Sequence, residues 1–196
     1  PSPLKMPLPL TLLDDRSILS SMSKRDTRTD ILIAGTDIIA RQGFNATGID
    51  AVSKAAGVPK GSFYHYFKSK DHFGHAVIDN YEAYYAKKMD RIFGDSSQSP
   101  LQRLVSFTVN AKNGMVKFDF KRGCLIGNLG QELAALDTQF RERLEGVLVS
   151  WEKRVAECLS EAIDSGELAL GQDPQALSRF FWVGWEGAIL RSKLMR

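Results

Sequence analysis

TGIDAVSKAAGVPKGSFYHYFKSK, residues 47–70, is the stretch that decides the fold. The hydroxyl of Thr47 can accept hydrogen bonds from the amides of a first helical turn, and Asp50, three residues later, favours the positive end of the helix dipole. Gly57 can adopt the positive φ that ends a helix. These signals predict a short helix that begins at Thr47 and ends before Gly57.

A second short helix follows a turn. Val58-Pro59 favours an extended residue and then the first turn of a new helix, so this helix is expected to begin near Lys60. Phe63 and Phe67 lie four residues apart on one face and are predicted to be core. Two short helices joined by a turn predict a helix-turn-helix, which lays its second helix in the major groove of DNA.

The other residues of this second helix are expected to face outward or to flank its exposed side. Their types are those that read a DNA groove. They are Lys60, Gly61, Ser62, Tyr64, His65 and Tyr66.

The stretch resembles the DNA-binding segment of the TetR family of bacterial transcriptional repressors. The similarity lies in AGV at 56–58, Gly61, the aromatic pairs FY at 63–64 and YF at 66–67, and SK at 69–70. The resemblance implies that the following helix transmits the regulatory signal and that Tyr66 and Lys70 contact phosphate groups. The full set of predicted DNA contacts is Arg28, Thr47, Lys60, Gly61, Ser62, Tyr64, His65, Tyr66 and Lys70.

A second resemblance covers RGCLIGNLGQELAAL at 122–136 and FWVGWEGAILRSKL at 181–194. These segments are similar to a subgroup of TetR-type repressors that sense reactive electrophiles and small unsaturated acids such as acrylate. Together the two resemblances cover most of residues 24–196. They imply a repressor that a small effector releases from its operator.

Charge is distributed unevenly along the chain, although the net charge is only +3. Residues 24–70 contain eight Lys and Arg against four Asp, whereas residues 71–196 contain sixteen against seventeen Asp and Glu. Positive charge confined to the helix-turn-helix segment is what phosphate binding requires, because each neutralised phosphate releases counterions. The alternative is an ordinary solvated charged face.

Lys24, Arg25 and Arg28 lie at the N-terminal end of the first expected helix, where the helix dipole disfavours positive charge. A phosphate or the minor groove is therefore a better explanation for them than the helix itself. The alternative is a basic tail without a specific contact.

Hydrophobic periodicity predicts an all-α fold of 196 residues with 43% hydrophobic content. An N-terminal arm at 1–23 is expected to be poorly ordered. It is followed by a three-helix helix-turn-helix DNA-binding lobe at 24–70 and a larger helical ligand-binding and dimerisation lobe at 71–196. Helices are expected at 24–42, 47–56, 60–66, 70–93, 101–119, from 124, at 137–165 and from 174, with a turn-rich linker at 94–100.

The last expected helix is apolar nearly all round, so it must be buried on two sides. We expect it to form a four-helix bundle with the helix at 137–165 and the same two helices of a second chain. Gly184, Gly187 and Ala188 would allow close approach. The apolar helical pattern continues up to Arg196, so a further segment is expected beyond it.

The two cysteines fit neither a disulfide framework nor a zinc pattern, which favours a reduced cytoplasmic location. No stretch resembles a signal peptide or membrane span.

Cys158 belongs to an apolar stripe and is expected to be core. Cys124 follows Lys121 and Arg122 at an expected helix start, where positive charge and the helix dipole favour thiolate; the alternative is a small buried hydrophobe.

Glu186 lies within the apolar last helix, so its carboxylate must be paired, protonated or solvated. It is either the partner of an arginine or a polar group in an effector pocket. The glycines after Cys124 serve close packing or leave room for a ligand. The predicted effector contacts are Met115, Phe118, Cys124, Asn128, Trp182, Trp185 and Glu186.

No converging set of acid, base and nucleophile appears, and no phosphate loop or metal spacing, so we expect no enzyme activity, catalytic residue, metal or cofactor. The sequence predicts a homodimeric, ligand-responsive repressor on a palindromic operator. The alternative is a DNA-binding regulator that has no small-molecule effector or that acts as an activator.

Overall fold

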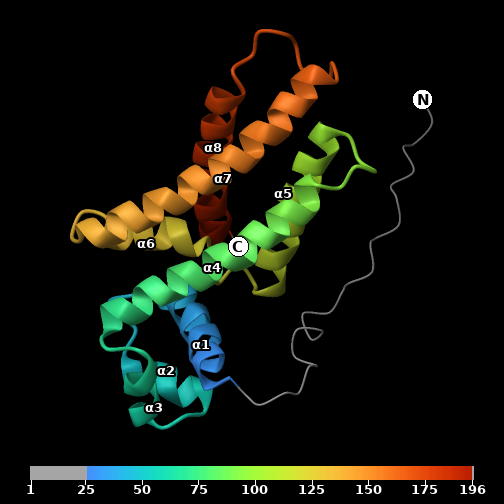
Figure 1. The fold of residues 1–196 in the computed structure, drawn as a ribbon. Coiled ribbons are helices and arrows are strands. Elements are labelled where there is room, and N and C mark those ends of the chain that lie inside the picture. The colour runs from blue at the N-terminus through green and yellow to red at the C-terminus, as the bar shows by residue number, and fades with distance from the viewer. Residues whose placement is uncertain (1–25, 196) are drawn as a thin grey trace.

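The computed structural model describes residues 26–195, and every regular element in that range is an α-helix (Figure 1). The predicted all-α fold is confirmed. The arm predicted at 1–23, together with Lys24 and Arg25, lies outside the described residues. The helices are α1 (Thr27–Gln42), α2 (Ile49–Ala56), α3 (Lys60–Tyr66), α4 (Lys70–Phe93), α5 (Pro100–Lys117), α6 (Leu125–Leu133), α7 (Thr138–Asp164) and α8 (Pro174–Leu194).

Most predicted helix ends have the expected capping geometry. Gly57 ends α2 in the left-handed region, with φ 69°. The side chains of Ser69, Asp137 and Asp173 accept hydrogen bonds from N–H groups in the first turns of α4, α7 and α8. Local capping chemistry therefore sets these boundaries.

The predicted N-cap role of Thr47 is wrong. Thr47 is only 2% exposed, and its hydroxyl donates to the carbonyl of Gly43 at 2.6 Å instead of accepting from the next turn. Gly48 is the N-cap residue, and α2 begins at Ile49. The first helix also begins later than expected, at Thr27.

The end of α5 differs from the prediction because two consecutive residues adopt left-handed backbone conformations. Asp119 has φ 53° and Phe120 has φ 51°, and the N–H of Phe120 donates to the carbonyl of Met115 at 2.9 Å. Left-handed conformations are costly for residues other than glycine. The helix therefore ends at Lys117, and a tight turn leads into α6.

The small lobe is built around an aromatic core. Phe63 and Phe67 are fully buried, as predicted, and their ring centroids lie 5.1 and 5.0 Å from that of Phe73 on α4. Ile31 and Ile39 of α1 complete this core. The core fixes α3 against α1 and α4, so the recognition helix cannot move by itself.

Helix α4 belongs to both lobes, as Figure 1 shows. At Gly74 it passes between Phe44, which follows α1, and Phe140 of α7. These two rings lie 5.3 Å apart, and His75 stacks on Phe140 at 4.2 Å. The absence of a side chain at position 74 allows this contact between the lobes.

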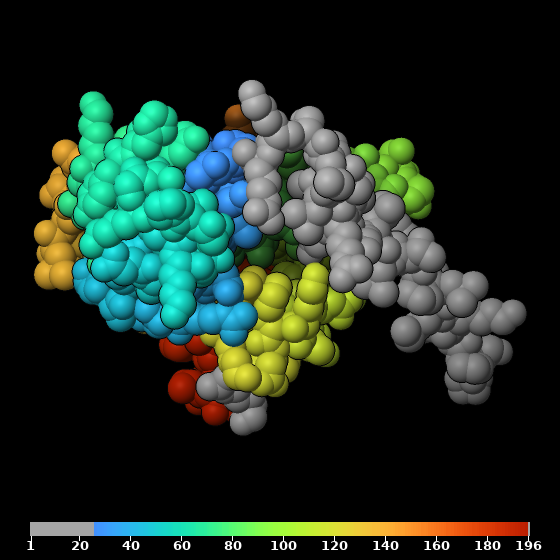
Figure 2. Space-filling model, turned by 90° about the horizontal axis from the view of Figure 1, so that it is seen from below, coloured from blue at the N-terminus to red at the C-terminus, as the bar shows by residue number. Residues whose placement is uncertain are grey.

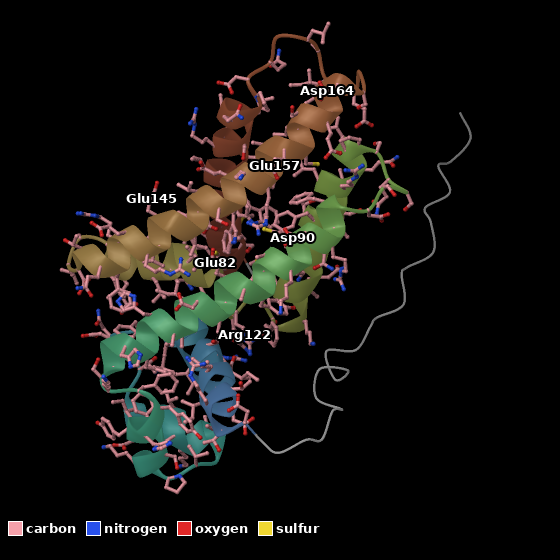
Figure 3. The ribbon with its side chains drawn as sticks, viewed as in Figure 1. Glu82, Asp90, Arg122, Glu145, Glu157 and Asp164 are labelled. Atoms are coloured by element: carbon pink, nitrogen blue, oxygen red, sulfur yellow. The ribbon has the colours of Figure 1, made fainter. Side chains whose placement is uncertain are left out.

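Ion pairs join α4 to α7 along the larger lobe. Arg143 contacts Glu82 at 2.5 Å, and Arg154 contacts Asp90 at 2.7 Å, two helical turns farther along α4 (Figure 3). The buried stripe of α7, which includes Trp151, faces α4, α5 and α6. These contacts hold α4 along the length of the larger lobe.

Helix α8 packs on α7 along one face only. Ser178 is fully buried and donates to the carbonyl of Glu152 at 2.7 Å. On the opposite face, Phe180 is 80% exposed and Val183 is 76% exposed. In the single chain, α8 is therefore not buried on two sides. None of the helices in the described range is long and apolar enough to cross a membrane.

We expect Gly74→Ala to destabilise the protein by about 1–3 kcal/mol, because overpacking a tight contact forces both neighbours to move. An added Cβ would lie 2.7 Å from the ring of Phe44 and 2.8 Å from that of Phe140. Urea unfolding followed by circular dichroism measures the change. Gly114→Ala in α5 is the control, since a Cβ there meets nothing within 4 Å, and it should not destabilise the protein. Equal effects of the two substitutions would contradict the packing argument.

Candidate functional site

Helix α3 presents most of its predicted DNA-reading residues to solvent. Lys60, Gly61, Tyr64 and His65 are exposed, with Tyr64 51% exposed, while Ser62 and Tyr66 are half-buried. In Figure 2, α2 and α3 form one broad projecting face of the molecule. A short helix whose inner face is aromatic core and whose outer face is polar suits insertion into a major groove.

Gly61 has no structural reason within the chain to be a glycine. A Cβ at this position would meet no atom within 4 Å, and its φ is not positive. Glycine within a helix costs about 1 kcal/mol relative to alanine. The missing side chain leaves the outer surface of α3 open to close approach by another molecule.

The predicted cationic contacts surround this helix. Lys60 makes an exposed ion pair with Asp50 of α2 at 2.8 Å, and the hydrogen bond to Asp50 raises the pKa of Lys60. Arg28 lies over the ring of Phe67, 5.5 Å from its centroid. The exposed ion pair of Lys60 is weak, so a phosphate can replace Asp50, and the Arg28 guanidinium keeps its hydrogen-bond donors for a phosphate.

Two predicted contacts have other roles in this structure. Lys70 donates to the carbonyl of Asn45 at 3.1 Å and lies 4.7 Å from the centroid of Phe44. Thr47 is turned inward by its hydrogen bond to the carbonyl of Gly43. Its side chain is therefore not available at the surface, contrary to its predicted contact with DNA.

Cys124 is the N-cap residue of α6, and its surroundings favour the second of the two interpretations, the buried thiol. The residue is 8% exposed, and burial, followed by the charge of Glu186, raises the pKa of its thiol well above the usual value. The nearby cations are engaged elsewhere: Lys121 pairs with Asp119, and Arg122 pairs with Asp37 of α1. The alternative of a buried thiol is therefore the one that the structure supports.

Glu186 is the hydrogen-bond partner of the Cys124 thiol. Burial raises the pKa of Glu186, and the hydrogen bond from the thiol lowers it. Its carboxylate lies against Gly127, where a Cβ would collide with it. The Oε1 atom is buried and has no hydrogen-bond partner, so the arginine partner that the sequence left open is absent from the described residues.

Six side chains from four helices form a series of neighbours that begins and ends on α8, and we call this set the Glu186 ring. From Glu186 and Cys124 it continues to Tyr81 of α4, whose hydroxyl accepts from the N–H of Leu125 at 3.4 Å, and to the adjacent Tyr85. Trp151 of α7 contacts both tyrosines and stacks on Trp182, one turn before Glu186 on α8. The members are Tyr81, Tyr85, Cys124, Trp151, Trp182 and Glu186.

The Glu186 ring contains three buried polar atoms without partners. They are Oε1 of Glu186 and the indole nitrogens of Trp151 and Trp182. Burial raises the pKa of Tyr85 to about 12 and that of Tyr81 well above its usual value, so both phenols are neutral at physiological pH. Unsatisfied buried polar groups are rare in proteins, where such atoms usually contact ordered water or a bound molecule.

The predicted effector contacts divide between this ring and its surroundings. Cys124, Trp182 and Glu186 belong to the ring. Trp185 packs on Phe107 and Phe181 instead, and Met115 lies 3.9 Å from Ser192 Oγ. Phe118 and Asn128 face the junction with α1: Phe118 lies under the guanidinium of Arg122, and Asn128 donates to the carbonyl of Ala40 at 3.4 Å.

Sequence reasoning missed a set of polar contacts that connects α6 to the helix-turn-helix lobe. The carboxylate of Glu132 accepts hydrogen bonds from the N–H groups of Phe44 and Asn45, at 2.7 and 2.6 Å. Arg122, labelled in Figure 3 between α4 and α1, adds its pair with Asp37. Figure 2 shows the segment around the start of α6 beside α1 and α2. Partners so distant in sequence leave no local pattern that could reveal them.

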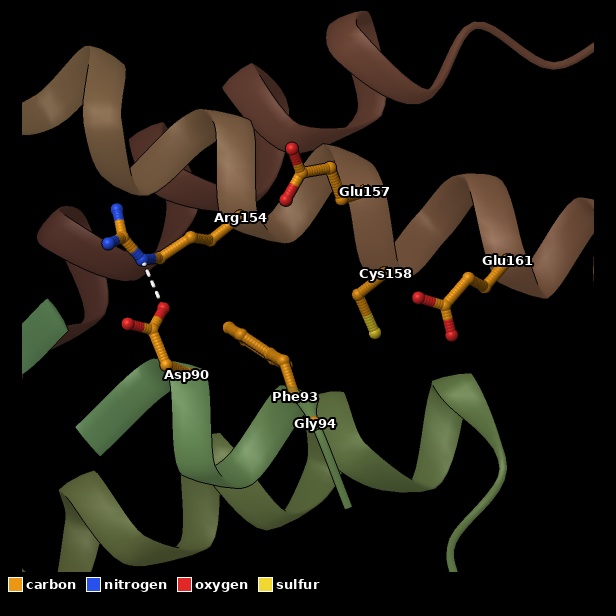
Figure 4. Close-up of a pocket in the computed structure, with 7 residues that line it drawn as sticks. All are labelled: Asp90, Phe93, Gly94, Arg154, Glu157, Cys158 and Glu161. Carbon is orange, nitrogen blue, oxygen red and sulfur yellow. Dashed lines mark hydrogen bonds and ion pairs between the residues drawn. The ribbon is translucent and has the colours of Figure 1, made fainter. Parts of the chain in front are cut away.

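Two cavities lie at other places than the Glu186 ring. One, of about 230 Å³, is lined by Cys158 and by charged residues of α4 and α7 (Figure 4). Its charges are already paired, Arg154 with Asp90 and Glu161 with Arg103, and the Cys158 thiol donates to the carbonyl of Pro100. The other lies over exposed faces of α7 and α8. Neither has the unpartnered buried atoms of the ring.

We expect alkylation of Cys124 by iodoacetamide to accelerate about tenfold per pH unit up to about pH 9, without a plateau, because the thiol pKa is raised. Cys158→Ser provides the background in which only Cys124 reacts. Adding Glu186→Gln removes a negative charge beside the sulfur and should increase the rate at about pH 8. Intact-mass measurements follow the reaction. A plateau below about pH 7 would show that the thiolate is already formed there.

Comparison with known proteins agrees with this architecture. Residues 31–77 match the family described as "Bacterial regulatory proteins, tetR family", and residues 100–196 match "Tetracyclin repressor-like, C-terminal domain". The transcriptional regulator AcuR of Cereibacter sphaeroides is 50% identical over 84% of this chain and 75% of its own length. The transcriptional repressor DhaR of Mycobacterium sp. is 30% identical over 89% of this chain and 86% of its own length.

Solved structures show the same fold. A regulatory protein TetR from Rhodobacter sphaeroides superimposes with a TM-score of 0.84 at 48% identity, covering 86% of this chain and 89% of that chain. The reduced form of Escherichia coli NemR gives a TM-score of 0.80 at 26% identity, covering 87% and 89%. The chain therefore belongs to the TetR family of bacterial transcriptional regulators, whose members are DNA-binding proteins and not enzymes.

Proposed function

We propose that this protein is a homodimeric repressor that leaves a palindromic operator when a small effector binds in the Glu186 ring. The observation that carries the proposal is the position of α6. Its N-cap residue, Cys124, belongs to the ring, and Glu132 in its last turn holds the N–H groups of Phe44 and Asn45. A shift of α6 on effector binding would therefore act directly on the helix-turn-helix lobe.

The DNA-binding part of the proposal rests on α3. Its outer face is polar and exposed, and it is flanked by Arg28 and by Lys60, whose exposed ion pair with Asp50 a phosphate can replace. Two copies related by a twofold axis would place two such helices in successive major grooves, roughly 34–36 Å apart. We assign residues 26–70 of the described chain to this function and 71–195 to effector binding and dimerisation.

The dimer part of the proposal rests on the uncovered face of α8. Besides Phe180 and Val183, this helix exposes Leu190 and Leu194. At Gly184 and Gly187 an added Cβ would meet nothing within 4 Å, so a second helix can approach closely. A four-helix bundle made of α7 and α8 from two chains would bury this face.

The effector part draws on the sequence resemblance to repressors that sense electrophiles and unsaturated acids. It also draws on the similarity to NemR, whose structure was solved in a reduced form. The raised pKa of Cys124 favours reversible binding of a small acid over rapid reaction of the thiol. The Glu186 ring joins side chains of α4, α7 and α8 to the N-cap of α6, so a ligand that enters between them would displace α6 relative to the other helices. Binding is thereby linked to movement of α6.

A regulator without a small effector is the second candidate, and it is favoured by the lack of ring residues in the lining of the two cavities described above. In that case the unpartnered atoms of Trp151, Trp182 and Glu186 would be satisfied by water. The two candidates differ in whether acrylate changes operator affinity.

We expect Gly61→Ala to stabilise the protein by up to about 1 kcal/mol and to weaken operator binding by about tenfold or more. The added methyl group has free space in the chain, so a loss of affinity must come from contact with DNA. Selection from random duplexes supplies the operator, and fluorescence anisotropy measures binding. Gly114→Ala is the matched control, because it adds the same methyl group to a helix outside the lobe. Unchanged affinity of Gly61→Ala would contradict the proposed role of α3.

We expect Glu132→Ala to reduce the effect of acrylate on operator binding. Coupling in allosteric proteins is typically about 5–150-fold, and the ratio of operator dissociation constants with and without acrylate should fall toward one in this variant. The two N–H groups of Phe44 and Asn45 lose their acceptor on α6, so its movement no longer reaches them. Gln131→Ala, an exposed neighbour on α6, is the control. A wild-type ratio in Glu132→Ala would exclude this route, and a ratio of one in the wild type would exclude acrylate as effector.

A further inference from the structure

Asp50 is the only acidic residue in the segment 47–70, which contains four lysines. Its carboxylate joins α2 to α3, because Oδ1 lies 2.8 Å and Oδ2 lies 3.1 Å from Nζ of Lys60, the first residue of α3. The hydrogen bond to Asp50 is the main cause of the raised pKa of Lys60. A cation that is proposed to contact phosphate is therefore held by a carboxylate of its own lobe.

The ion pair is too exposed to be needed for the position of α3. The side chain of Lys60 is 53% exposed and that of Asp50 is 76% exposed. Such pairs contribute little to stability, because water and salt screen them. The recognition helix is held instead by Phe63 and Phe67, which are fully buried. The charge of Asp50 also favours the start of α2, but that effect does not require both carboxylate oxygens to contact Lys60.

Asp50 lies close to any phosphate that Lys60 contacts. Two acceptors hydrogen-bonded to one ammonium group are about 6 Å apart or less. This distance is shorter than the Debye length of about 8 Å at physiological ionic strength, so the two negative charges repel each other. DNA must therefore either displace Asp50 from Lys60 or share Lys60 with it, and both lower the affinity.

We propose that Asp50 limits the affinity of this protein for DNA by competing with a backbone phosphate for Lys60. The inference rests on the proposed DNA-binding role of α3 and adds a residue that opposes it. Because phosphate contacts carry no sequence information, the limit applies equally to the operator and to other DNA. It also serves regulation, since allosteric coupling typically changes an affinity by only about 5–150-fold and could not release a repressor that binds DNA much more tightly.

Asp50→Asn tests the proposal, because it removes the charge and keeps the shape of the side chain. Fluorescence anisotropy measures binding of the full chain to the selected operator and to a random duplex of the same length. We expect both dissociation constants to fall by about twofold to fivefold. The slope of log affinity against log salt concentration should become steeper by up to about 0.9, the contribution of one phosphate. Asp50→Glu, which keeps the charge, should bind both duplexes like the wild type.

Two further comparisons separate the competition for Lys60 from a general effect of charge. Asp71→Asn removes an exposed acid from the first turn of α4 and should change the affinity less. In a Lys60→Ala background, Asp50→Asn should have no larger effect than Asp71→Asn. In a Lys54→Ala background, which lacks an exposed lysine of α2, Asp50→Asn should keep its full effect. Circular dichroism establishes that each variant is folded.

The other outcomes overturn the inference. Weaker binding of Asp50→Asn to both duplexes would show that the pair braces α3. An effect that persists without Lys60, or that Asp71→Asn equals, would show a general effect of charge. A change in the selected operator sequence would show that Asp50 reads bases. These results all leave the proposed function intact, whereas a wild-type protein that binds neither duplex would contradict the proposed function as well.

Discussion

The contact of Phe44 and Phe140 across Gly74 is the constraint on which the arrangement of this protein depends. One ring belongs to the small lobe, the other to the larger lobe, and α4 fits between them only because position 74 has no side chain. Close packing of this kind resists gradual deformation and instead permits discrete alternatives. The two lobes consequently move as packed bodies, and a signal must change how α4 and its neighbours meet.

Helix α6 adds directional contacts to this apolar junction. Hydrogen bonds from consecutive N–H groups to one carboxylate, as at Glu132, lose strength quickly when their geometry changes, whereas apolar packing tolerates small shifts. At the other end of the same helix, Cys124 and Glu186 form a buried polar pair. A helix of nine residues thus has polar attachments at both ends, and a change at one end alters the geometry at the other.

The sequence predicted the features that depend on neighbouring residues. The caps at Ser69, Asp137 and Asp173, the glycine end of α2 and the buried face of α3 all follow from local spacing, and the structure has them. The protonation state of Cys124 could not be predicted, because the cations beside it in sequence pair with other groups in space. Glu132 was missed for the same reason, since its partners are 88 and 87 residues away. The ring required four helices to be placed before its unpartnered atoms could be recognised.

The uncovered face of α8 has a consequence for genetics. TetR regulators bind DNA as dimers, and the surface that joins two chains here would lie on helices separate from the one that reads DNA. A subunit with a damaged α3 and an intact α8 would still pair with a normal subunit. Mixed dimers would then carry one competent recognition helix and would bind a palindromic operator weakly, because most of the affinity requires contact with both half-sites. Loss-of-function alleles in α3 would therefore be dominant, whereas alleles that destroy the α8 face would be recessive.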